Sequence, residues 1–272
     1  MDAPAYSADM RENHLRAAIE SGDPSLGTRI MNAWPGVIEV LGQTDAFDYV
    51  EFLAEYAPYD LYDLEHIGRA ADLAGLSTMI KIDAENRAFT AQRAMAAGID
   101  NLLFADVRTV EDAREAVEAV RAEPGGKNGV RMDRRSGYVG GYASPEEVVD
   151  ICADAVVAIM VEKEETVENL EDILAVSGVD MVQFGPADYS LSIGKPGETR
   201  AEEVIEAERR TIETALDMGV APRAEINRPR GAADYLEMGV RDFNLNTDLG
   251  ILYSFWSEQG ADLDGRLSGH SR

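Results

Sequence analysis

Two carboxylates follow apolar runs that have the length of buried strands. The first run, 155–161, is followed directly by Glu162, and the second, 179–184, is followed four residues later by Asp188. The segment between them, 166–177, is long enough for one helix, so the sequence predicts a strand–helix–strand unit with parallel strands. Parallel strands end at the same edge of a sheet, where two acids repel each other unless a cation lies between them. The pattern therefore predicts a divalent metal, Mg²⁺ or Mn²⁺, held by Glu162 and Asp188.

The alternative is that these acids only cap the helices that follow them. The run Gly185-Pro186-Ala187-Asp188 favours the metal site, because Gly-Pro turns the backbone rigidly at the strand end. Together with Glu162, this run resembles the HpcH/HpaI aldolase and citrate-lyase family of metal-dependent aldolases. The resemblance covers roughly residues 26–250 and is gapless from Glu162 to Asp188. It implies that these two acids are the protein ligands of the metal, and that Gly185, Pro186 and Ala187 bind the substrate.

Two positions depart from the pattern of that family. Tyr56 stands where the family carries a histidine that assists proton transfer, and Lys81 stands where it carries a carboxylate-binding arginine. The pKa of a free tyrosine is about 10, against about 6.5 for histidine, so Tyr56 is a poor base but can donate a proton or orient a water. Lys81 keeps the positive charge without the bidentate fork. It could bind a carboxylate, form a Schiff base with a ketone, or only pair with a strand-end acid.

A long irregular segment, 123–142, contains six glycines and three closely spaced arginines, Arg131, Arg134 and Arg135. Long loops in compact barrels are usually functional or mobile. The family carries a Gly-x-Arg segment near the mouth of the site, which Gly129-Val130-Arg131 matches loosely, so the resemblance makes Arg131 a candidate substrate-binding residue. Three arginines in a glycine-rich loop suit either a multiply anionic substrate arm or a contact between subunits, and both interpretations stay open.

Apolar runs alternate with segments of helical periodicity along the whole chain. The predicted strands span 26–31, 47–53, 78–82, 101–105, 155–161, 180–184, 222–226 and 242–245. The predicted helices span 35–44, 60–75, 86–97, 109–122, 144–153, 166–177, 201–218, 229–238 and 249–258. Eight strands that are each followed by a helix predict a single (β/α)8 TIM barrel over residues 1–272. A doubly wound sheet is the alternative, but the glycine-rich fingerprint after the first strand is missing.

In a barrel the active site forms at the carboxyl ends of the strands. Polar residues gather at these ends in the sequence, and this ring as a set indicates a site: Asn32, Glu55, Tyr56, Lys81, Asp83, Asp106, Glu162, Asp188, Arg223, Glu225, Asn227, Asn246 and Asp248.

The composition is strongly acidic, with 51 acidic against 25 basic residues and a net charge of −26. Such a surface repels nucleic acid and anionic membranes, which excludes both as expected partners. Only four of the basic residues are lysines, and many acids with few lysines are expected of a protein adapted to a high-salt cytoplasm, where salt screens self-repulsion. The first residues have no apolar signal segment, no apolar run is long enough to span a membrane, and the single Cys152 cannot form an internal disulfide. We therefore expect a cytoplasmic protein.

The resemblance implies a metal-dependent carbon–carbon lyase that cleaves or forms a bond to a pyruvate-like 2-oxo acid through a metal-bound enolate. A barrel that binds metal and ligand without catalysis, as a regulatory or assembly subunit, is the alternative, and a phosphate-binding barrel is the least favoured. The run 249–256 is more apolar and aromatic than an exposed final helix should be, which predicts a homo-oligomer. Related aldolases exchange their last helix between neighbours, so the expected assembly is a hexamer, a trimer of dimers.

Overall fold

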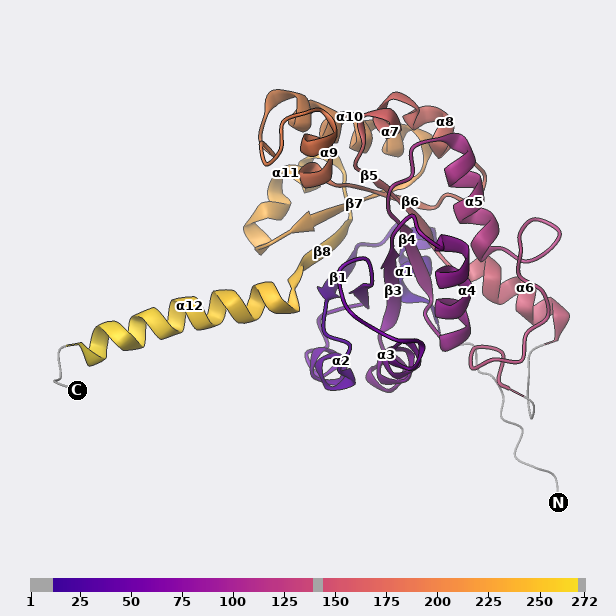
Figure 1. Ribbon diagram of the computed structural model, residues 1–272, viewed down its shortest axis with the longest axis horizontal. Helices are drawn as coiled ribbons and strands as arrows, with labels where there is room; N and C mark the ends of the chain where they lie inside the picture. Colours follow the sequence, from indigo (N-terminus) through magenta and orange to yellow (C-terminus); the bar gives the residue numbers. More distant parts are fainter. Residues whose placement is uncertain (1–11, 139–143, 269–272) are drawn as a thin grey trace, which may run out of the picture.

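The computed structural model describes residues 12–138 and 144–268 and contains a closed barrel of eight parallel strands (Figure 1). The strands follow one another around the barrel in chain order, and β1 also pairs with β8, with Ser25 opposite Asp242. The strands are β1 (Ser25–Ile30), β2 (Tyr49–Leu53), β3 (Ser77–Ile82), β4 (Asn101–Phe104), β5 (Val157–Val161), β6 (Met181–Phe184), β7 (Ala221–Ile226) and β8 (Asp242–Thr247). The predicted TIM barrel is confirmed, and ring closure excludes a doubly wound sheet.

Helices surround the barrel at the predicted positions, with two additions. They are α1 (His14–Ser21), α2 (Pro35–Gly42), α3 (Leu61–Ala74), α4 (Arg87–Ala97), α5 (Val110–Val120), α6 (Pro145–Asp154), α7 (Glu164–Glu168), α8 (Leu170–Leu174), α9 (Pro186–Ser192), α10 (Glu202–Met218), the 3₁₀ turn η1 (Pro229–Ala232), α11 (Ala233–Met238) and α12 (Asp248–Leu267). The helix expected over 166–177 is two short helices that meet at Asn169. The sequence interpretation did not include α1 and α9.

Several helix boundaries follow from local chemistry. Asp60, Thr109 and Ser144 each form a capping box with the acid three residues later, which satisfies free amide groups of the first turn. Gly75 and Gly219 end α3 and α10 in the left-handed conformation that glycine adopts without steric cost. These signals fix where the chain returns to the barrel, and so they fix the register of the strand ends.

The inside of the barrel is divided into an apolar and a polar part. Tyr49, Met79, Leu103, Met160 and Met181 belong to one buried apolar cluster that comes mainly from β2 to β6. Side chains from the opposite wall are polar: β7 contributes Arg223, which lies 2.7 Å from Glu51 of β2, and neither side chain has any solvent exposure. Asn244 of β8 donates a hydrogen bond of 2.5 Å to the same carboxylate.

The last helix, α12, leaves the barrel and projects into solvent (Figure 1). Only Asp248 at its first position is buried, while Tyr253, Phe255 and Trp256 are 74, 61 and 66% exposed. The helix has 20 residues and so extends well past the predicted end at 258. None of the helices in the described part of the chain is both long and apolar enough to cross a membrane.

Candidate functional site at the carboxyl ends of the strands

Glu162 lies directly after β5 and is buried, with 1% exposure. Its Oε1 accepts a hydrogen bond of 2.9 Å from the backbone N–H of Asp106, which lies two residues after the end of β4 and has a φ of +53°. Its Oε2 is buried and has no hydrogen-bond partner among the described residues. Burial raises the pKa of this carboxyl, and Lys81 opposes that rise. A buried carboxylate oxygen without a partner is costly unless a cation binds it.

Gly185 makes room for this carboxylate. A Cβ at this position would lie 2.9 Å from Cβ of Glu162 and 3.2 Å from its Oε2, so any other residue would push Glu162 away. Pro186 then begins α9, and this helix carries Asp188 in its first turn. The glycine in this run is therefore required by a close approach to the acid of the neighbouring strand.

Asp188 faces the same region and is more open, with a side-chain exposure of 41%. Its Oδ1 lies 3.9 Å from Nζ of Lys163, whose ammonium also lies 3.1 Å from Oδ1 of Asp106. Asp188 is close enough to Glu162 that their charges repel, which contributes to the raised pKa of Glu162. The structure thus brings the two predicted metal ligands to one edge of the barrel. Lys163, which the sequence analysis did not single out, lies between Asp106 and Asp188.

Lys81 and Tyr56 meet beside Glu162. Nζ of Lys81 donates a hydrogen bond of 2.9 Å to the Tyr56 hydroxyl, lies 2.6 Å from Oε2 of Glu55, and lies 3.9 Å from Oε2 of Glu162. Burial alone would lower the pKa of Lys81, but the charges of Glu162 and Glu55 outweigh it and raise the pKa above its usual value. The ammonium therefore stays protonated. A protonated lysine is not the nucleophile that a Schiff base requires.

The Tyr56 hydroxyl keeps its proton at neutral pH. Burial raises the pKa of Tyr56 to about 12, against the opposing effect of the hydrogen bond from Lys81. The side chain is nevertheless half exposed and reaches the mouth of the barrel. A phenol in this state is a proton donor or a hydrogen-bond donor, and not a base.

Arg131 does not lie near Glu162 and Asp188. Its guanidinium donates to Asp133 at 2.6 Å, to Asn128 at 3.1 Å and to the carbonyl oxygen of Gln92 in α4 at 3.2 Å. The neighbouring Arg134 and Arg135 pair with Asp72, in the last turn of α3, and Asp100, just before β4. Both acids precede a strand, so this loop lies at the amino ends of the strands and the structure does not bring Arg131 to the edge that holds Glu162.

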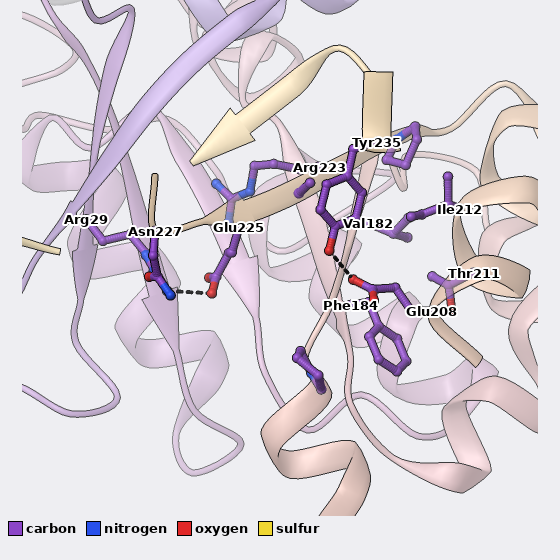
Figure 2. Close-up of a pocket in the computed structure, with 13 residues that line it drawn as sticks. Arg29, Val182, Phe184, Glu208, Thr211, Ile212, Arg223, Glu225, Asn227 and Tyr235 are labelled. Carbon is purple, nitrogen blue, oxygen red and sulfur yellow. Dashed lines mark hydrogen bonds and ion pairs between the residues drawn. The ribbon is translucent and has the colours of Figure 1, made fainter. Parts of the chain in front are cut away.

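A second polar group occupies the β7–β8–β1 side of the same edge. Arg29 of β1 and Glu225 of β7 form an ion pair of 2.5 Å and line a cavity of about 170 Å³ together with Asn227 and Pro186 (Figure 2). The sequence placed Glu225 and Asn227 in the ring of strand-end residues but missed Arg29. A charged residue inside an otherwise apolar strand, as in Leu26-Gly27-Thr28-Arg29-Ile30, is the signal that could have found it.

The comparison with known proteins agrees with this geometry. Residues 37–241 match the family described as HpcH/HpaI aldolase/citrate lyase. The chain belongs to this family. A hydroxypyruvate/pyruvate aldolase of Paraburkholderia phytofirmans is 32% identical over 257 residues, covering 92% of this chain and 91% of that protein. A 5-keto-4-deoxy-D-glucarate aldolase of Klebsiella pneumoniae is 29% identical over 244 residues, covering 89% of this chain and 93% of that one.

A solved structure of an HpcH/HpaI aldolase/citrate lyase family protein from Burkholderia cenocepacia has a TM-score of 0.83 and 26% identity, and the match covers 93% of this chain and all of that chain. The predicted family is confirmed, and the chain is a carbon–carbon lyase. This sets aside the barrel without catalysis that the sequence left open.

The residues at the strand ends fit the divalent metal that the family implies. The unpartnered Oε2 of Glu162 supplies one buried oxygen, and Asp188 supplies a more exposed one. Within residues 12–138 and 144–268, no group of three or more His, Cys, Asp or Glu side chains is arranged to hold a metal. Two carboxylates would therefore leave several positions of the metal for water and substrate, as Mg²⁺ commonly requires.

Proposed function

We propose that the protein is a metal-dependent aldolase that cleaves or forms a carbon–carbon bond at the methyl carbon of a pyruvate-like 2-oxo acid. The observation that carries this proposal is the buried oxygen of Glu162 that accepts no hydrogen bond from the described residues and lies beside Asp188. When bound there, Mg²⁺ or Mn²⁺ would act as a Lewis acid for the negative charge that develops on the substrate oxygens. The relatives named as aldolases for hydroxypyruvate, pyruvate and ketodeoxyglucarate support a 2-oxo acid as the substrate.

The surrounding side chains have separate tasks in this proposal. Lys81, held protonated by Glu55 and Glu162, attracts the carboxylate of the substrate. Tyr56 donates its phenolic proton, or orients a water that does so, when the new hydroxyl or methyl group forms. The glycine at 185 leaves space above Glu162, and the backbone of Gly185, Pro186 and Ala187 lies along one wall of that space. The chain thereby supplies fixed positive charge and one proton donor.

Exchange of the methyl protons of pyruvate in D₂O tests this function without knowledge of the second substrate. An aldolase of this type passes a proton from the methyl group to solvent water and takes a deuteron back, so the NMR signal of the methyl group should disappear in the presence of Mn²⁺ or Mg²⁺ and persist with EDTA. Exchange that proceeds equally fast in EDTA would contradict the metal proposal. No exchange with any divalent metal would contradict the 2-oxo acid.

We also propose that α12 packs against a second copy of the chain. Its aromatic residues Tyr253, Phe255 and Trp256 are exposed in one chain, and apolar surface of this kind is typical of an interface. A hexamer built as a trimer of dimers is the assembly that we expect. Light scattering at low and at multimolar salt tests this, and a monomer under both conditions would contradict it.

A further inference from the structure

The cavity beside Arg29 lies at the gap between β6 and β7, with Arg29 and Glu225 on one side and residues of β6 and α10 on the other. Arg29 and Glu225 are the residues just before the last residue of β1 and of β7. Their neighbours Ile30 and Ile226 pack in the outer apolar clusters, so these two charged side chains face inward. Pro186, two residues before Asp188, lines the same cavity, which places it next to the metal-binding edge.

Tyr235 and Glu208 line the end of the cavity next to α10. The paired residues of β6 and β7 end at Gln183 and Arg223, and the strands separate beyond that point. Figure 2 shows Arg29 and Glu225 on one side of the gap and Tyr235 with Glu208 on the other. The Tyr235 hydroxyl donates a hydrogen bond of 2.7 Å to Glu208.

A buried chain of hydrogen bonds holds Glu225 and Arg29 in place. Arg223, paired with Glu51, donates a bond of 2.5 Å to Oε1 of Gln183, and Gln183 Nε2 donates to Oε1 of Glu225. Oε2 of Glu225 accepts from Nη1 of Arg29, whose Nε donates to the carbonyl oxygen of Asn246 at 3.2 Å. Groups fixed in this way lose little freedom when a ligand binds.

Unused hydrogen-bonding capacity remains on both charged groups. Nη2 of Arg29 makes no hydrogen bond to any described residue, and the Arg29 side chain is 14% exposed. Each oxygen of Glu225 accepts one bond from the protein and can accept another. The pair therefore offers one donor and one acceptor side by side. Its two opposite charges cancel.

We infer that Arg29 and Glu225 form the subsite for the aldehyde partner, and that this partner carries hydroxyl groups and no charge. A hydroxyl both accepts and donates, so it can bind Nη2 of Arg29 and an oxygen of Glu225 together. An anionic arm would meet the carboxylate of Glu225, and an alkyl arm would leave Nη2 of Arg29 and the remaining lone pairs of Glu225 unused. This inference rests on the proposed aldolase function, because that function supplies the reaction in which the aldehyde takes part.

The test compares three aldehydes in Mn²⁺-dependent addition to pyruvate. Glyceraldehyde carries two hydroxyls, 2-methylbutanal has methyl groups in their place, and succinic semialdehyde carries a carboxylate. The native enzyme should have its highest kcat/KM with glyceraldehyde. Arg29→Leu should lower the ratio of kcat/KM for glyceraldehyde to that for 2-methylbutanal by about 10–100-fold, the effect of losing a hydrogen bond to a charged group.

Two further variants complete the experiment. Arg209→Leu makes the same change on the exposed face of α10, where Arg209 pairs with Glu206 and Glu213, and should leave the ratio unchanged. Glu225→Gln keeps the shape and removes the charge, so it should raise kcat/KM for succinic semialdehyde relative to glyceraldehyde by about 10-fold. This second variant decides the question if Arg29→Leu does not fold.

The inference is overturned if the native enzyme prefers either of the other aldehydes. It is also overturned if a folded Arg29→Leu protein with native Mn²⁺ affinity keeps the native ratio of kcat/KM for glyceraldehyde to that for 2-methylbutanal. Pyruvate methyl exchange by the native enzyme separates this failure from a failure of the proposed function, since exchange needs no aldehyde. If exchange is absent, calorimetric titration with glyceraldehyde still decides: the subsite requires a dissociation constant at least about 10-fold higher in Arg29→Leu.

Discussion

The two sides of the barrel mouth use charge in different ways. On the β5–β6 side, Glu162 has a buried oxygen that accepts no hydrogen bond from the described residues. On the β7–β8–β1 side, Arg29 and Glu225 are bound to each other and, through Gln183, to the buried Arg223. On the first side a buried carboxylate oxygen keeps its hydrogen-bonding capacity, with the Lys81 ammonium 3.9 Å away, whereas on the second side both oxygens of Glu225 already accept hydrogen bonds. We therefore expect the first side to bind a cation and the second to recognise a ligand through hydrogen bonds.

The largest effect should come from the acids on the metal side. Asp188→Ala should abolish Mn²⁺ binding and lower kcat by at least about 10³-fold, because the Lewis acid is lost. Asp188 is partly exposed, so the unfolding temperature should change little. Titration calorimetry measures the first effect and calorimetric melting the second. If the variant binds Mn²⁺ with native affinity, the metal binds elsewhere, and the contrast between the two sides of the barrel mouth is wrong.

Tyr56 tests whether the protein supplies the proton on the metal side. Tyr56→Phe should lower kcat by about 10²–10⁴-fold with unchanged Mn²⁺ affinity, the range of general acid–base groups. Since the pKa of Tyr56 is raised to about 12, the phenol keeps its proton below that pH. The native enzyme should therefore lose no activity through this group between pH 7 and 10. A rise in kcat near pH 10 that Tyr56→Phe removes would instead identify a phenolate base.

The polar side should be more important for stability than for metal binding. Arg223→Met leaves Glu51 buried and uncompensated, and should lower the free energy of unfolding by about 3–5 kcal/mol, measured by urea denaturation at fixed protein concentration. The double variant Glu51→Leu with Arg223→Met should recover most of this loss. Arg209→Met, on the surface, should change the stability by less than about 0.5 kcal/mol. A double variant as unstable as the single one would show that the other polar partners dominate.

The smallest expected effect concerns Lys163. Its ammonium lies 3.9 Å from Asp188 and competes with the metal for that carboxylate. Lys163→Met should therefore raise the Mn²⁺ affinity by no more than about 5-fold, as expected for a partly exposed ion pair. Calorimetric titration against the native protein measures this. A lower affinity would mean that Lys163 positions Asp188 and does not compete with the metal.

The sequence predicted the barrel, and it predicted that Glu162 and Asp188 lie at one edge of it, because both depend on local patterns. The Gly-Pro-Ala-Asp run and its distance from Glu162 are visible in the chain, and eight alternating strand and helix segments allow one economical closure. The subsite at Arg29 was not predicted because its parts come from β1 and β7 and become neighbours only when the ring closes. The placement of Arg131 failed for the same reason, since its partners on α4 are determined by packing.

The protonation states of Tyr56 and Lys81 also could not be predicted from the sequence. The pattern showed that Tyr56 and Lys81 replace other residues, but not that Lys81 is enclosed by two carboxylates and keeps its proton. Such shifts depend on burial and on distances between residues that are far apart in the chain. The length of α12 was underestimated because amphipathic periodicity fades after residue 258, while the helix continues without a barrel to pack against.

The left-handed backbone at Asp106 sets a limit on how this enzyme can evolve. The N–H group of Asp106, and not its carboxylate, holds Oε1 of Glu162, and the φ of +53° directs that group inward. Glycine, asparagine and aspartate adopt this conformation readily, whereas a β-branched residue does so only with strain of about 1–3 kcal/mol. Among natural variants, position 106 should thus accept a change of charge but reject a change of shape. The backbone conformation therefore limits which amino acids can occupy this position.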